Sequence, residues 1–86
     1  MGKKEKQLAR LEKNPKAVGP DVLQTVLAAF GYRKVRQKGS HATYRDGQGN
    51  KFVVPFKRPN VKQHYVEEVI ARLRTQLLEE EEDAGE

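Results

Sequence analysis

The sequence contains no cysteine and no long hydrophobic run. Without cysteine the chain can form neither a disulfide nor a thiolate metal site. Its longest apolar stretches fall well short of the ~20 residues that a membrane-spanning helix needs. No apolar segment follows the charged first six residues, so they do not resemble a signal peptide. We therefore expect a small cytoplasmic protein that does not associate with a membrane.

The sequence also lacks the residue patterns of several enzyme classes. Its two histidines, His41 and His64, are 23 positions apart, and the acidic residues near them are scattered. This spacing does not form a metal-ligand set. There is no glycine-rich nucleotide loop, no convincing Ser/His/Asp order and no paired carboxylate site. We therefore expect neither a metal nor a cofactor.

Charge is distributed unevenly along the 86 residues. The chain has 17 basic and 12 acidic residues, a net charge of +5, but residues 79–86 hold six of the acids and no base. Between Gly31 and Lys62, nine bases accompany a single acid, Asp46. Such a block is typical of a surface that binds phosphates, although the solvated face of any basic protein has the same composition. We favour nucleic-acid binding.

A short N-terminal helix is predicted over residues 3–13. Leu8 and Leu11 are its only large apolar side chains, and the remaining residues are good helix formers. The narrow apolar stripe predicts a helix that docks only loosely. Asn14-Pro15 ends it, because the residue before a proline is disfavoured in the α conformation. Residues 14–20 then form a linker.

Two further helices have broader apolar faces. The first is expected to begin with Asp21 as its N-cap, with Gln24 at the spacing of a capping box, and to close at Gly31. The last spans residues 61–78 and has Asn60 as its expected N-cap. Apolar side chains recur at helical period in both segments.

Three short strands are predicted between these helices, over residues 32–37, 40–45 and 51–54. A turn at Gly39-Ser40 joins the first two, and a glycine-containing loop at 46–50 joins the second and third. The order predicts an α+β fold, with two helices packed on one face of a three-stranded antiparallel sheet, α-β-β-β-α, and an extra N-terminal helix.

The predicted elements divide the chain into three parts. Residues 1–19 form a helical extension with its linker, and residues 20–78 form the α+β domain. The acidic residues 79–86 have nothing apolar to bury, so we expect a disordered tail.

Alternation along the middle strand places its side chains on two faces. Ala42 and Tyr44 fall on one face, and His41, Thr43 and Arg45 fall on the other. The apolar pair is expected to face the helices. His41 then lies on the open face or at its rim, while His64, near the start of the last helix, is expected to be exposed without a catalytic role.

His41 is the candidate catalytic residue. It follows Gly39-Ser40, where backbone N–H groups at a turn can approach a phosphate closely. The imidazole is suited to act as the base on an RNA 2′-hydroxyl, while nearby cations stabilise a pentacoordinate phosphorane. An exposed histidine with no function is the simpler alternative. The predicted RNA-binding residues are Arg36, Lys38, Gly39, Ser40, Arg45, Lys51, Lys57 and Arg58.

Several short runs of the sequence match the motifs of one family. They are Phe30-Gly31-Tyr32, the segment from Arg36 to His41, Tyr44-Arg45, Gly49-Asn50-Lys51 and Val53-Val54-Pro55. These runs, with the helical segment that follows them, resemble the HicA toxin family of mRNA interferases over about residues 20–76. Many members carry a second histidine directly after the first, where this chain has Ala42.

The resemblance implies a double-stranded-RNA-binding-domain-like fold. It also implies cleavage of mRNA through the motif histidine, which corresponds to His41, and neutralisation by a HicB-type antitoxin that covers the site. From the sequence we therefore expect a metal-independent endoribonuclease. Two alternatives remain open: a module of the same fold that binds RNA without cleaving it, and an adaptor whose basic surface binds an acidic protein.

Overall fold

Three helices and three strands make up the chain in the computed structural model, which describes residues 2–55 and 60–84, with side chains as far as Glu80. The predicted α+β fold, its element order and the extra N-terminal helix are confirmed. In chain order the elements are α1 (Lys3–Lys13), α2 (Pro20–Ala29), β1 (Arg33–Lys38), β2 (His41–Arg45), β3 (Lys51–Pro55) and α3 (Gln63–Ala84).

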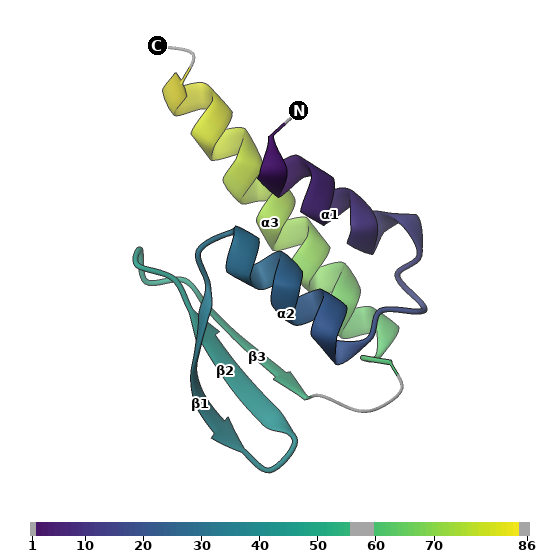
Figure 1. The fold of residues 1–86 in the computed structure, drawn as a ribbon. Helices are drawn as coiled ribbons and strands as arrows, with labels where there is room; N and C mark the ends of the chain where they lie inside the picture. The colour runs from purple at the N-terminus through teal and green to yellow at the C-terminus, as the bar shows by residue number, and fades with distance from the viewer. Residues whose placement is uncertain (1, 56–59, 85–86) are drawn as a thin grey trace.

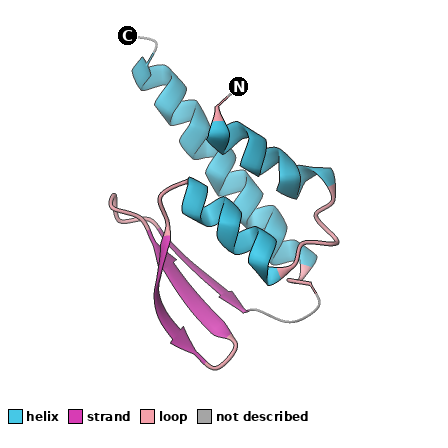
Figure 2. Cartoon of the chain, in the orientation of Figure 1, coloured by secondary structure: helices cyan, strands magenta, loops and turns pink. Residues whose placement is uncertain are grey.

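The strands form one antiparallel sheet in the order β1-β2-β3. Figure 1 shows α2 and α3 on the same side of this sheet, and Figure 2 shows its other side free of helices. The strand side chains that point towards the helices are buried, namely Ala42, Tyr44, Phe52 and Val54. They join the apolar faces of α2 and α3 in one core. The prediction that Tyr44 belongs to the core is therefore correct.

The edge strand β1 lies outside this core. All six of its residues are exposed, so the helices do not cover it. Its pairing with β2 shifts by one residue between Lys34 and Arg36, which leaves Val35 as the extra residue of a β-bulge. Val35 is consequently 54% exposed, although it is the most apolar residue of the strand.

Helix α1 is firmly docked, so the prediction of a loosely docked helix is wrong. It packs against α2 and α3, on the side of α2 that faces away from the strands (Figure 1). Leu8 and Leu11 are 4% and 0% exposed, and Val18 in the following linker is also buried. The narrow apolar stripe is sufficient to dock α1, because both of its leucines enter the core shared with the other two helices.

Polar contacts also tie the N-terminal segment to the last helix. Lys4 forms an ion pair with Glu80, and Arg74 forms one with Glu12. In addition, the N–H of Val61, just before α3, donates a 2.8 Å hydrogen bond to the carbonyl of Val18.

Both predicted helix caps differ from those observed. The N-cap of α2 is Gly19, and Asp21 lies within the first turn. Proline at position 20 explains the shift, because its fixed φ suits the first helical position, where an N–H has no partner in the helix. Helix α3 begins at Gln63, beyond Asn60.

Helix α3 continues to Ala84, whereas we expected disorder from residue 79. Glutamate is a good helix former, so the acidic segment can prolong a helix that is already nucleated by packing. The contact of Glu80 with Lys4 supports its first turn. This end of α3 lies far from the β1–β2 turn (Figure 1), so residues 79–84 do not lie over the basic part of the sheet.

Candidate nucleic-acid interface

His41 is the first residue of β2, and its side chain is exposed. The two-residue turn before it, Gly39-Ser40, joins paired residues Lys38 and His41. Gly39 has φ of +61°, and glycine with positive φ at the first turn position is the pattern of a type II′ hairpin. Glycine therefore sets the geometry that places His41 beside Lys38 at this end of the sheet.

The sheet has an outer face, turned away from the helices, that is built in three cross-strand rows. Residues paired across antiparallel strands project on the same side, so the register identifies them. The first row is Lys38, His41 and Pro55; the second is Arg36, Thr43 and Val53; the third is Arg33, Arg45 and Lys51. As predicted, His41, Thr43 and Arg45 lie opposite the buried pair Ala42 and Tyr44.

The outer face carries five cations and no acid among its nine residues. Three of the cations, Arg33, Arg45 and Lys51, stand directly opposite one another in one row. Like charges in this arrangement destabilise a sheet by about 0.2–1 kcal/mol per pair. A row of this kind is unfavourable for the free protein and favourable for one that binds a polyanion.

Most of the predicted RNA-binding residues lie on the same face of the sheet as His41 or in the turn beside it. Arg36, Lys38, Arg45 and Lys51 lie on the outer face, and Gly39 with Ser40 forms the turn beside it. Lys57 and Arg58 lie outside the described residues. Arg33 was not among the predicted contacts, because only the bulge at Val35 brings it opposite Arg45.

Pro55 belongs to β3 and pairs with His41, although it was expected to end the strand one residue earlier. Proline is tolerated here because β3 is an edge strand, in which one side of the backbone needs no partner strand.

The loop between β2 and β3 is fixed by the carboxylate of Asp46. Its Oδ1 accepts hydrogen bonds from the backbone N–H groups of Gln48 and Asn50, both 2.9 Å long, and its Oδ2 accepts one of 2.8 Å from Nδ2 of Asn50. Partial burial alone raises the pKa of Asp46, but these hydrogen bonds and one from Gln76 bring its pKa below the usual value. The single acid between Gly31 and Lys62 is therefore held as an anion by its own loop.

This loop is anchored to α3 through Gln76. Nε2 of Gln76 donates to Oδ2 of Asp46 at 3.4 Å, and Oε1 of Gln76 accepts a 3.1 Å hydrogen bond from the hydroxyl of Tyr32. Burial, followed by the charge of Asp46, raises the pKa of Tyr32, while Gln76 and Arg72 lower it less. Burial also raises the pKa of Tyr44. Both tyrosines therefore stay protonated and structural.

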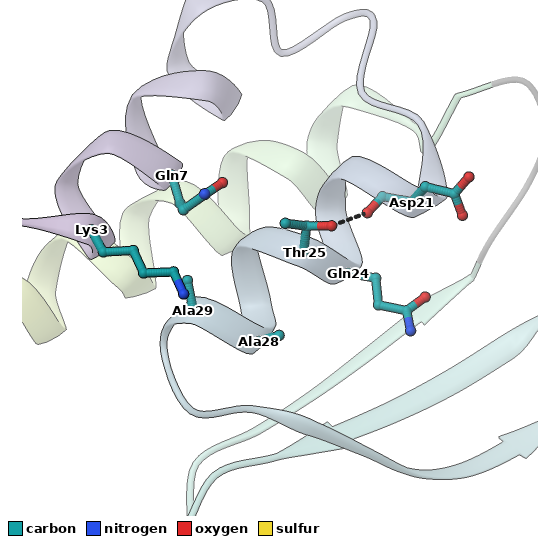
Figure 3. A pocket seen from close by; sticks show the side chains of 7 residues that line it. All are labelled: Lys3, Gln7, Asp21, Gln24, Thr25, Ala28 and Ala29. Carbon is teal, nitrogen blue, oxygen red and sulfur yellow. Dashed lines mark hydrogen bonds between the residues drawn. The ribbon is translucent and has the colours of Figure 1, made fainter.

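One pocket lies away from the outer face, on the helical side of the molecule. Figure 3 shows it between α1 and α2, where Thr25 Oγ1 donates a 2.9 Å hydrogen bond to the carbonyl of Asp21 one turn earlier. Its lining contains neither a histidine nor a residue of the sheet. The lining residues are Lys3, Gln7, Asp21, Gln24, Thr25, Ala28 and Ala29.

Within residues 2–55 and 60–84, no three His, Cys, Asp or Glu side chains gather as a metal-ligand group. In the same part of the chain no helix is long and apolar enough to cross a bilayer. His64, the other histidine, is exposed as predicted, and its ring lies 4.1 Å from that of Tyr65.

Comparison with known proteins identifies the family of the chain. No curated protein and no solved structure is similar to the chain at a significant level. A family model described as the HicA toxin of bacterial toxin–antitoxin systems matches residues 21–74. This region contains α2, the whole sheet and the apolar part of α3, and leaves α1 outside. Because the match covers more than half of the chain, the protein belongs to the HicA toxin family.

Proposed function

We propose that the protein is a metal-independent endoribonuclease that uses His41 on the phosphodiester. The observation that carries this proposal is the position of His41, exposed at the end of an outer face that has five cations and no acid. Membership of a toxin family supports it. A polyanion that binds to this face brings a phosphate to His41.

In the proposed reaction, the neutral imidazole of His41 removes the proton from an RNA 2′-hydroxyl. The 2′ oxygen attacks the adjacent phosphorus, and the bond from phosphorus to the 5′ oxygen breaks. The departing oxygen takes a proton from solvent. The products are a 2′,3′-cyclic phosphate and a 5′-hydroxyl. Lys38, directly opposite His41, and the N–H groups of the Gly39-Ser40 turn stabilise the charge that develops on the phosphorane.

The test is cleavage of a labelled single-stranded RNA with EDTA present. We expect the wild-type protein to cleave it and His41→Ala to lose at least 100-fold in rate, the typical lower bound for a general base, while still binding the RNA. His64→Ala is the matched control, because His64 is also exposed but lies on α3. A substrate with 2′-deoxy at the cleaved position should resist the wild-type enzyme.

Two outcomes would contradict this proposal. Cleavage that survives His41→Ala would place the chemistry elsewhere, and products with 5′-phosphate ends would show that water, rather than the 2′-hydroxyl, is the nucleophile. If the wild type binds RNA but does not cleave it, the second candidate holds: an RNA-binding module that uses the same outer face. The five cations of that face favour this function as well.

We also infer that a HicB-type antitoxin is the protein partner, and that it inhibits by covering the outer face. The proposal rests on family membership and on the exposure of this face. The same surface then serves RNA and antitoxin in turn, so the two should compete for binding. An enzyme that acts on mRNA would work in the cytoplasm.

A further inference from the structure

The cations of the outer face are not spread evenly over the three strands. Strand β1 supplies three of them, Lys38, Arg36 and Arg33, one in each row. In the first two rows, β2 and β3 supply no lysine, arginine or acid, only His41, Thr43, Val53 and Pro55. The first two rows are therefore divided into a charged edge on β1 and a neutral interior on β2 and β3, whereas the third row is charged on all three strands.

The charged edge fits a nucleic-acid backbone. Lys38 and Arg36 are two residues apart on β1, about 6.6 Å along a strand, which is close to the separation of successive phosphates in an extended RNA strand. The bulge at Val35 carries the series on to Arg33. Because β1 is exposed along its whole length, a backbone can follow it without displacing any part of the protein.

The neutral interior fits unpaired bases. Thr43 and Val53 face each other in the middle row, and Val53 is 48% exposed although it is apolar. Val53 also borders a groove between β3 and α3, in which Tyr65 and Val69 lie beside the charged residues Lys51, Glu68 and Arg72. From β1 to β3 the distance is two strand spacings, about 10 Å, which is within the reach of a nucleotide from its phosphate to the edge of its base.

We propose that RNA lies on the outer face as an extended single strand, with its phosphates along β1 and its bases over Thr43 and Val53. This inference rests on the proposed RNA-binding function and adds the direction in which each nucleotide lies. A duplex does not satisfy the arrangement, because its bases are stacked inside and cannot reach Val53 while its backbone follows β1. The phosphate next to Lys38 is then the one presented to His41.

The experiment measures binding on a His41→Ala background, so that its outcome does not depend on cleavage. Three probes are compared at one salt concentration: a short single-stranded RNA, the same strand with abasic positions, and a duplex of the same sequence. Val53→Ser should weaken binding of the intact single strand about fivefold, the effect of losing part of an apolar contact. It should leave binding of the abasic strand unchanged.

Two controls separate the charged edge from the interior. Leu78→Ser also removes an exposed apolar side chain, 57% exposed on α3, and should not change binding of any probe. Arg36→Gln should weaken the intact and abasic strands alike. It should also reduce the slope of log affinity against log salt by about 0.7, the value for one phosphate contact of a single strand, whereas Val53→Ser should leave that slope unchanged.

The binding mode is supported if Val53→Ser discriminates the intact from the abasic strand and the duplex binds more weakly than the single strand. It is overturned if Val53→Ser weakens both single strands equally or neither of them, or if the duplex binds at least as tightly. Failure of cleavage in the wild type, with the binding pattern intact, would overturn the proposed chemistry and leave this binding mode standing.

Discussion

Neutralising Arg45 should make the protein more stable and, at the same time, a poorer RNA binder. Arg45 is the middle member of the third row, directly opposite Arg33 and Lys51. No hydrogen bond or ion pair joins its side chain to another described residue. Arg45→Gln therefore relieves two like-charge pairs, each costing about 0.2–1 kcal/mol. Because the row is exposed and screened by solvent, we expect a net gain of about 0.5 kcal/mol in the free energy of unfolding.

Thermal unfolding at low ionic strength measures this gain. For a domain of this size, about 0.5 kcal/mol raises the midpoint by about 2–4 °C. The gain should shrink with added salt, since the Debye length falls from about 30 Å at 0.01 M to about 3 Å at 1 M. Lys16→Gln is the control for net charge, because Lys16 is exposed in the linker before α2. In parallel, Arg45→Gln should weaken RNA binding and lower its salt slope.

A loss of stability in Arg45→Gln, or a gain that is the same at all salt concentrations, would refute the electrostatic account of the row. An equal gain in Lys16→Gln would assign the effect to net charge rather than to the opposed side chains. Either result would remove the main physical reason for regarding the outer face as adapted to a polyanion.

Two further predictions concern the scaffold. Leu11→Ala should lower the free energy of unfolding, measured by urea denaturation, by about 2–5 kcal/mol, because Leu11 is fully buried. Leu78→Ala, at an exposed position, should change it by less than about 0.5 kcal/mol. Equal effects of the two substitutions would show that α1 is undocked in solution. The pKa of Asp46 is lower in the folded protein than in the unfolded chain. The ionised carboxylate therefore stabilises the fold at pH values above the pKa of the unfolded chain, and this stabilisation is lost as the pH falls through the pKa of the folded protein. The stability difference between wild type and Asp46→Asn should therefore be largest near neutral pH and vanish in strong acid, and a difference that does not depend on pH would contradict the hydrogen-bonded loop.

The sequence was sufficient to predict the arrangement around His41. Strict alternation in β2, with Ala42 and Tyr44 apolar, requires that His41 and Arg45 project to the opposite face. Gly39, two residues before His41, marks the turn that brings Lys38 beside His41. These are local properties, set by residues close in the chain, and local patterns are what sequence reasoning reads well.

Features that depend on distant residues could not be predicted in this way. Two leucines on α1 do not reveal that α2 and α3 leave a place for them in the core. Likewise, nothing local to Val35 shows that it forms a bulge, and the bulge decides that Arg33, rather than Lys34, completes the third row. Proline at position 20 outweighed the capping potential of Asp21, since both competed for the same helix start.

The contact between Lys4 and Glu80 has a practical consequence for handling the protein. It holds the start of α1 beside the outer part of α3, and Figure 1 shows the start of α1 and the last turns of α3 at the end of the molecule opposite the turn between β1 and β2. An affinity tag, a fluorophore or a link to a sensor surface at either terminus is thus attached away from His41. Immobilised protein should present the whole outer face to solution, whichever end is tethered.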